Sequence, residues 1–260
     1  MLITPIKTRR ILPPKDDLLG AIEDALPRIA NESIVVVTSK VVSIWQGRCV
    51  PTDAYPNKDA LIKKEADYYL PRDVAPNKWC VHTLKNNVFI PNAGIDESNA
   101  NGYYILWPRN PKYVAKQMWA WLRNQYGVKR VGVILCDSHT IPLRRGVVGI
   151  SLAHYGFAPL YDYRGKRDLF GRPFEMSQTN IPDGVAAAAV VAMGEGAECT
   201  PLAVIENVPR IRFVSKPVEM KKAGASFEMK TKDDLYYPLL SSVPWKKGGR
   251  GVPRKERPDV

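Results

Sequence analysis

The sequence predicts an α+β fold in which mixed sheets pack against helices. Segments with helical periodicity alternate with short β-branched runs, but the regular strand–helix–strand repeat of a doubly wound sheet does not occur. The chain has 260 residues and is 45% hydrophobic, which is enough to bury a substantial core. Because no internal repeat or central linker divides it, we expect any two lobes to be intertwined rather than separate.

The first half of the chain supplies two predicted helices and two predicted strands. Residues 16–26 (DDLLGAIEDAL) have helical spacing, with acidic residues in the first turn, where the helix dipole favours them. Residues 33–42 hold the run IVVVTSKVV, which predicts a buried strand that breaks into a polar turn. Residues 55–69 are predicted to be a helix charged on one face, and residues 88–90 a short strand.

The second half continues the alternation. Residues 112–126 (KYVAKQMWAWLRNQY) predict an amphipathic helix that stops at Gly127. Residues 130–136 (RVGVILC) predict an apolar strand that runs directly into Asp137. The remaining expected elements are a strand at 146–152, a polar loop at 162–172, a helix of small residues at 182–193 and a strand at 202–206.

We divide the chain into a catalytic body, residues 1–214, and a C-terminal segment, residues 215–260. The last part of this segment, from residue 245 onward (WKKGGRGVPRKERPDV), is rich in glycine, proline and basic residues. That composition is typical of a mobile tail.

Charge and cysteine usage limit the function classes. The chain carries 38 Lys and Arg against 26 Asp and Glu, a formal charge of +12, which favours anionic partners such as nucleic acid, an acidic membrane face or phosphorylated small molecules. The four cysteines form no CxxC pair, which argues against a zinc site or a disulfide framework. No apolar run has the length of a signal peptide or a membrane span, so we expect a cytoplasmic protein without a membrane partner.

Three acidic residues occupy the ends of predicted elements. Asp96 and Asp137 each follow an apolar strand, and Glu195 lies in MGEG, just after the alanine-rich helix. Mg²⁺ and Mn²⁺ prefer oxygen ligands, and carboxylates at the ends of rigid strands suit them. Acidic residues are equally typical of turns and helix caps, so the pattern alone leaves both interpretations open.

Basic residues gather in two glycine-containing segments. Arg144 and Arg145 precede a glycine in LRRGVVG, and residues 162–172 (DYRGKRDLFGR) include Arg167 among several other basic residues. Guanidinium groups beside flexible backbone are suited to bidentate contacts with phosphate or carboxylate. A solvated charged loop is the alternative.

Four of these segments, taken in order, point to a family. NAGIDESN, DSH followed by RRGVVG, DYRGKRDLFGR and MGEG resemble the coenzyme F420-0:L-glutamate ligase family, and the similarity covers roughly the first 205 residues. The resemblance implies an α+β, two-lobed fold with intertwined protomers, and therefore a homodimer. It also implies GTP-dependent amide formation between L-glutamate and the carboxylate of coenzyme F420-0, through an acyl phosphate. Two divalent ions, Mg²⁺ or Mn²⁺, are the expected cofactors, and K⁺ is a further candidate ion.

The resemblance assigns roles to individual residues. The implied metal ligands are Asp96, Asp137, Ser138 and Glu195. The implied nucleotide contacts are Leu12, Pro13, Ser39, Lys40, Asn99, Met193, Gly194 and Gly196. The expected catalytic residues are Arg144, Arg145, Arg167 and Asp168, the arginines through contacts to the anionic acceptor and to glutamate. Chemistry of this kind depends on positioning and charge, so none of the cysteines needs to act as a nucleophile.

Two positions depart from the family pattern and keep alternatives open. Ile44 stands where the family usually has a lysine, and Thr140 follows DSH where the family usually has glycine. The same chemistry on a folate-like acceptor, the use of ATP instead of GTP, and a nucleotide-binding protein without activity therefore remain alternatives. A nucleic-acid-binding protein is a further alternative because of the net charge, but the basic and aromatic residues do not follow any RNA-binding module.

Overall fold

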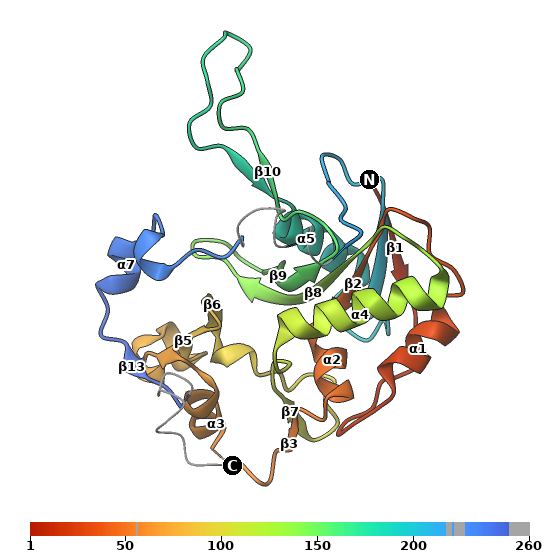
Figure 1. Cartoon of the computed structure of the whole chain (residues 1–260). Helices are drawn as coiled ribbons and strands as arrows, with labels where there is room; N and C mark the ends of the chain where they lie inside the picture. The colour runs from red at the N-terminus through yellow and green to blue at the C-terminus, as the bar shows by residue number, and fades with distance from the viewer. Residues whose placement is uncertain (56, 217–219, 221–226, 250–260) are drawn as a thin grey trace.

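The computed structural model describes residues 1–55, 57–216, 220 and 227–249. Its centre is a five-stranded sheet with the order β1-β12-β2-β8-β9 (Figure 1). The pair β2–β8 is parallel and the other neighbouring pairs are antiparallel, so the predicted α+β fold with a mixed sheet is confirmed. The strands are β1 (Leu2–Ile6), β2 (Ser33–Thr38), β8 (Val131–Thr140), β9 (Val147–Tyr155) and β12 (Leu202–Glu206).

Helices cover both faces of the central sheet. Along β2, Val35 and Val37 point into one hydrophobic cluster, whereas Ile34 and Val36 point into another. The first cluster is closed by α1 (Leu18–Ala25), α2 (Ser39–Trp45) and α4 (Pro111–Tyr126), and the second by α5 (Ile181–Met193). A strand buried on both faces has no polar alternation, which explains the continuous apolar run in the sequence.

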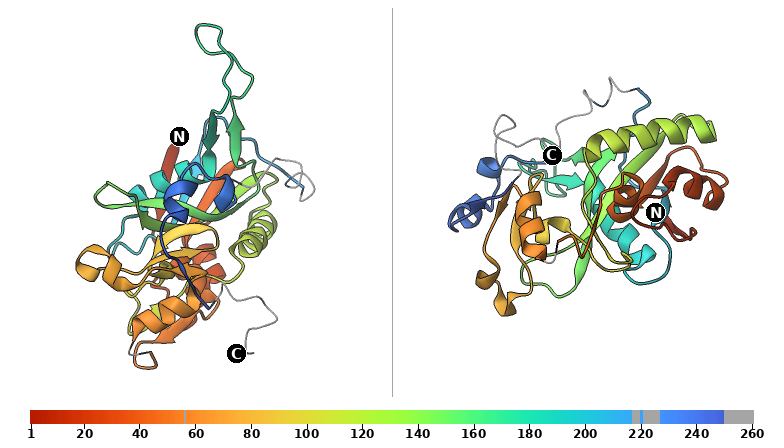
Figure 2. Two further views of the ribbon diagram at one scale, coloured as in Figure 1. Left: turned by 90° about the vertical axis from the view of Figure 1, so that its left-hand side faces the viewer. Right: turned by 90° about the horizontal axis from the view of Figure 1, so that it is seen from below.

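A smaller lobe packs beneath the central sheet (Figures 1 and 2). Its antiparallel sheet has the order β13-β4-β5-β6 and packs with α3 around a core of its own. The elements that build it are α3 (Lys58–Glu65), β4 (Tyr68–Tyr69), β5 (His82–Lys85), β6 (Val88–Pro91) and β13 (Lys246–Lys247), with the adjoining pair β3 (Cys49–Pro51) and β7 (Tyr103–Ile105). Short 3-10 helices at Arg72–Val74, Pro76–Lys78 and Asn92–Gly94 belong to this lobe, and Thr231–Asp233 and α7 (Tyr237–Ser241) follow in the C-terminal segment.

One hairpin projects from the body. Strands β10 (Leu160–Asp162) and β11 (Gln178–Asn180) pair with each other, and the connecting segment, residues 163–177, extends away from both lobes (Figure 1). Near its tip, Leu169 is 97% exposed and Phe170 is 95% exposed. Large apolar side chains exposed to this degree are typical of surfaces that contact another molecule.

Three predicted strand ends were wrong. The expected polar turn after the first buried strand is the helix α2, because Val41 and Val42 are buried in the core and packing outweighs the low helix propensity of valine. Strand β8 continues through Asp137 to Thr140, since its pairing with β9 persists beyond the apolar run. The predicted strand at residues 146–152 likewise extends, to Tyr155.

Two predicted helices were too long. Strand β4 takes up Tyr68–Tyr69, so the helix predicted over 55–69 is only α3, which Asn57 caps through hydrogen bonds from the amides of Asp59 and Ala60. The acidic residues expected in the first turn of α1 precede it: Asp17 is the N-cap, and Asp16 pairs with Arg9 at 2.8 Å.

The other predicted elements, at 88–90, 112–126, 182–193 and 202–206, are confirmed as β6, α4, α5 and β12.

The start of the predicted tail joins the smaller lobe, because β13 pairs with β4 and the amide of Gly249 donates to the carbonyl of Lys63. Residues 250–260 lie outside the described residues, so the mobile tail stays a prediction for them.

Stability should fall in mild acid because of His154. This histidine, which its apolar neighbours predict to be packed, contacts the rings of Phe157 and Phe227, and its Nε2 has no hydrogen-bond partner among the described residues. Burial, together with the charge of Lys112, lowers the pKa of His154 to about 4. In the unfolded chain the imidazole of His154 takes up a proton near pH 6.5, but in the folded chain it does so only near pH 4. The free energy of unfolding is therefore highest above pH 6.5 and decreases as the pH falls from 6.5 to about 4.

We expect His154→Phe to reduce the loss of unfolding free energy between pH 8 and pH 5 by about 2 kcal/mol. Urea unfolding of both proteins at the two pH values measures this difference. Equal pH dependence in the two proteins would contradict the assignment.

Candidate active site

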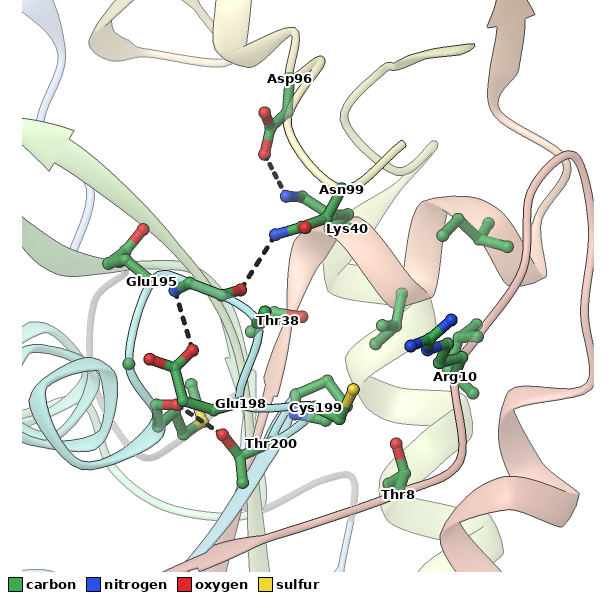
Figure 3. Close-up of a pocket in the computed structure, with 18 of the residues that line it drawn as sticks. Thr8, Arg10, Thr38, Lys40, Asp96, Asn99, Glu195, Glu198, Cys199 and Thr200 are labelled. Carbon is green, nitrogen blue, oxygen red and sulfur yellow. Dashed lines mark hydrogen bonds and ion pairs between the residues drawn. The ribbon is translucent and has the colours of Figure 1, made fainter. Parts of the chain in front are cut away.

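A cavity of about 720 Å³ brings together residues from distant parts of the sequence (Figure 3). All four residues predicted as metal ligands line it, namely Asp96, Asp137, Ser138 and Glu195. Most of the predicted nucleotide contacts also line it, namely Leu12, Pro13, Lys40, Asn99, Met193, Gly194 and Gly196. Ser39 is the exception, because its side chain is buried at the start of α2.

The parallel pair at the centre of the sheet explains this convergence. Thr38 at the end of β2 is in register with Cys136 of β8, so the residues that follow them meet at one edge of the sheet. The segment before β12 reaches the same edge, where the amide of Thr38 donates to the carbonyl of Pro201 at 3.0 Å. The β8–β9 pairing shifts register between Leu135 and Cys136, immediately before Asp137, and bulges of this kind redirect side chains next to active sites.

Asp96 is held by a lysine from the other lobe. Lys40 Nζ lies 2.5 Å from Asp96 Oδ2 and donates to the carbonyl of Ser98 at 3.0 Å. Asp96 Oδ1 accepts hydrogen bonds from the amide and the hydroxyl of Ser98, each at 2.9 Å. Burial on its own would raise the pKa of Asp96, but the charge of Lys40 and these hydrogen bonds hold the pKa below its ordinary value.

Asp137 is the more deeply buried carboxylate. Its Oδ2 accepts a hydrogen bond from Trp107 Nε1, and its Oδ1 accepts one from the amide of Ser138 at 2.9 Å. Burial raises the pKa of Asp137 to about 6, and the negative charge of Asp96 adds to this effect, while the two hydrogen bonds and Lys40 oppose it. A carboxylate in such surroundings is stabilised by an added cation.

The loop after α5 is shaped by a carboxylate that sequence reasoning missed. Glu198 Oε2 accepts a hydrogen bond from the amide of Gly196 at 2.8 Å, and Asn99 Nδ2 donates to the carbonyl of Gly196 at 2.9 Å (Figure 3). Gly194 has φ +79°, and a Cβ at this position would lie 2.7 Å from the Glu198 carboxyl group. Glycine is therefore required where the loop turns beneath the cavity.

The acidic residues suit ions that also bind phosphate. Ser138 Oγ donates to Glu195 Oε2 at 3.2 Å, which links these two predicted ligands. Within the described part of the chain, no three His, Cys, Asp or Glu side chains converge closely enough to hold one ion by themselves. Mg²⁺ is usually held by one or two carboxylates, with phosphate and water oxygens completing its shell, so the arrangement fits an ion that arrives with a nucleotide.

The cavity also contains positive charge and an apolar wall. Arg10 lines it, and its guanidinium has no ion-pair partner among the described residues, whereas the neighbouring Arg9 is paired with Asp16 (Figure 3). Ile44, the departure from the family pattern, is buried at the cavity wall against Ala100 and Ile105. Sequence reasoning missed Arg10, although the pair of arginines before ILPP was a usable signal.

The four predicted catalytic residues do not line this cavity. Arg144 and Arg145 are exposed in the loop between β8 and β9. Arg167 and Asp168 lie in the projecting segment 163–177, where Arg167 Nη1 donates to the carbonyl of Gly171 and Asp168 Oδ1 accepts the amides of Phe170 and Arg172. A single chain therefore does not bring these residues to the acidic cluster.

Comparison with known proteins identifies the family of this chain. The sequence model of the F420-0:Gamma-glutamyl ligase family matches residues 5–207. The chain belongs to this family. The fold of this chain, with several sheets and packed helices, is consistent with the F420-0:Gamma-glutamyl ligase family. Membership supports a ligase function. No helix in the described residues has both the length and the apolar character needed to cross a membrane.

Three relatives carry the name coenzyme F420:L-glutamate ligase. The protein of Methanopyrus kandleri is 29% identical over 249 residues, covering 89% of this chain and 96% of the relative. That of Methanocaldococcus jannaschii is 31% identical over 196 residues, covering 70% and 78%. That of Methanococcus maripaludis strain C6 is 36% identical over 136 residues, covering 52% and 54%.

Proposed function

We propose that this family member joins L-glutamate to the carboxylate of coenzyme F420-0, with GTP as co-substrate. The observation that carries the proposal is the cavity that Asp96, Asp137 and Glu195 line together with Lys40, which pairs with Asp96. Carboxylates that hold divalent ions, next to a cation that contacts phosphate, are the groups that phosphoryl transfer from a nucleotide requires.

The lining residues divide into two groups by chemistry. The residues that would contact the nucleotide are Leu12, Pro13, Asn99, Met193, Gly194 and Gly196, and Lys40 and Arg10 would bind its phosphates. Asp96, Asp137, Ser138 and Glu195 would hold two divalent ions, Mg²⁺ or Mn²⁺, with K⁺ as a further candidate. When bound, these ions neutralise the charge that develops on the transferred phosphoryl group. Arg10 would supply a cation that compensates for isoleucine at position 44.

The proposed reaction has two steps. An oxygen of the acceptor carboxylate attacks the γ-phosphorus, the bond to the β,γ-bridging oxygen breaks, and GDP leaves with that electron pair. The amine of glutamate then attacks the acyl carbon of the resulting acyl phosphate, loses a proton, and inorganic phosphate leaves. Lys40 and Arg10 bind and orient phosphate oxygens, so the chain contributes positioning and fixed charge rather than a covalent nucleophile.

A homodimer would account for the projecting hairpin. Leu169 and Phe170 are almost fully exposed in a single chain, and Arg167 and Asp168 are adjacent to them. We propose that this hairpin packs against a second protomer, which buries the two apolar side chains and gives the predicted catalytic residues a role across the interface. Burial of a leucine and a phenylalanine contributes about 3–6 kcal/mol to association.

The double substitution Leu169→Asp with Phe170→Asp should therefore convert the dimer to monomers, raising the dissociation constant at least about a hundredfold. Light scattering coupled to size exclusion measures the mass of each form. Val74→Asp, at an exposed apolar residue of the smaller lobe, is the control and should remain dimeric. A double variant that is still a dimer would exclude this hairpin as the main contact.

The proposed activity is tested with purified protein, Mg²⁺ or Mn²⁺, L-glutamate and GTP or ATP. Coenzyme F420-0 and a reduced folate acceptor are offered in parallel, and mass spectrometry measures the addition of one glutamyl unit per GDP formed. We expect glutamylated F420-0. A glutamylated folate would keep the chemistry and change the acceptor, whereas salt-sensitive RNA binding with no product and no nucleotide turnover would reject the proposal.

A further inference from the structure

Trp107 connects the smaller lobe to Asp137, the half-buried carboxylate of the cavity. It follows β7 in the sequence and is itself only 3% exposed, and its indole Nε1 donates a hydrogen bond to Asp137 Oδ2. We infer that Trp107 is a positioning residue that fixes the orientation of the Asp137 carboxylate for cation binding. This inference rests on the metal site of the proposed function.

The hydrogen bonds of Asp137 leave both of its oxygens able to bind a cation. Trp107 donates to Oδ2 and the amide of Ser138 donates to Oδ1, so each oxygen accepts one hydrogen bond. A carboxylate oxygen has two acceptor positions, and one therefore remains free on each. Two donors on different oxygens also prevent rotation of the carboxylate, which lowers the entropy lost when an ion binds.

The indole is held in place on several sides. A Cβ at Gly94 would lie 2.1 Å from its nitrogen, so only glycine allows the ring to occupy this position. The Nζ of Lys85 lies 5.5 Å from the centre of the ring, within the range of a cation–π contact. Arg48 Nε donates to the carbonyl of Trp107 at 3.3 Å, which fixes the backbone as well.

These contacts form part of a buried ionic network behind the ring. Glu65 Oε2 lies 2.8 Å from Arg48 Nη2 and 3.1 Å from Lys85 Nζ, and Lys85 also donates to the carbonyl of Ala93 at 3.1 Å. Both basic residues that touch Trp107 are therefore anchored to one carboxylate of α3. The smaller lobe therefore helps to set the position of the indole, and with it the orientation of Asp137.

The test is Mn²⁺ affinity, measured by electron paramagnetic resonance of free Mn²⁺ in the presence of a non-hydrolysable GTP analogue. In the main variant, β-(3-benzothienyl)alanine replaces Trp107, which keeps the ring and removes only the N–H donor. We expect Mn²⁺ to bind at least about tenfold more weakly, with little change in melting temperature. Trp107→Phe should weaken binding at least as much, and Trp79→Phe, at a tryptophan that is 80% exposed, is the matched control.

A double-mutant cycle with Asp137→Asn shows whether Trp107 acts through this carboxylate. In that background, the change at Trp107 should produce no further loss of Mn²⁺ affinity. Wild-type affinity in the benzothienyl variant, or an undiminished loss in the Asp137→Asn background, would overturn the positioning role alone. Failure of the wild-type protein to bind Mn²⁺ would remove both this role and the metal site of the proposed function.

Discussion

The substitution Asp137→Asn is expected to lower the rate of glutamate ligation about a thousandfold while the protein remains folded. The carboxylate lines the cavity, and the chain must supply negative charge there if a divalent ion is to neutralise the transferred phosphoryl group. Because burial already raises the pKa of Asp137 to about 6, the neutral amide removes an unfavourable buried charge. The amide nitrogen of asparagine cannot accept a hydrogen bond, so one of the two donors, Trp107 Nε1 or the Ser138 amide, loses its acceptor. These two effects oppose each other, and the free energy of unfolding should change by less than about 2 kcal/mol.

The rate is measured as glutamylated product formed per unit time under saturating nucleotide. Glu97→Gln is the matched control, since Glu97 is adjacent to Asp96, is 54% exposed at its side chain and pairs with Lys58 at 2.9 Å. We expect the control to retain activity within about twofold. A rate for Asp137→Asn within tenfold of the wild-type rate would contradict the role of this carboxylate.

The substitution Glu65→Ala should reduce the free energy of unfolding by about 3–5 kcal/mol. Glu65 pairs with both Arg48 and Lys85, and Lys85 has no exposed surface at all. Burial on its own would raise the pKa of Glu65, but the charges of these two partners hold it below its ordinary value. Removing the carboxylate takes away the negative charge that Glu65 supplies to the buried ammonium group of Lys85, which is the costly case for a buried ion pair.

Chemical denaturation with urea at pH 7 measures this loss. The comparison is Glu97→Ala, because the Lys58–Glu97 pair lies at the surface and should contribute no more than about 1 kcal/mol. Similar losses in the two variants would show that the network behind Trp107 does not stabilise the smaller lobe.

Apolar patterning was sufficient for much of the fold. It placed α4, α5 and β12, because these elements have a clear helical period or a compact apolar run. It failed at α2, where Val41 and Val42 favour a strand locally but are buried in a helix. It also ended β8 too early, since pairing with β9 continues through the polar residues Asp137 and Ser138, which face the cavity.

The candidate site was only partly predictable. The residues taken from the family resemblance, such as Asp96, Asp137 and Glu195, do gather in one cavity, although their spacing along the chain gave no sign of it. Trp107 could not be found from the sequence, because its contact with Asp137 depends on how the two lobes pack. Anion binding by the basic segments around Arg144 and Arg167 stays a prediction, and that they do not line the cavity follows from the tertiary structure, which their sequence did not reveal.

The central claim is that this cavity activates the acceptor carboxylate by phosphoryl transfer. The most direct measurement is ligation with coenzyme F420-0 labelled with ¹⁸O in that carboxylate, followed by mass spectrometry of the phosphate and the amide. We expect one ¹⁸O atom in inorganic phosphate for each amide formed, with the other retained in the amide carbonyl. Formation of the amide with unlabelled phosphate, or no amide in the presence of GTP, Mg²⁺ and L-glutamate, would contradict it.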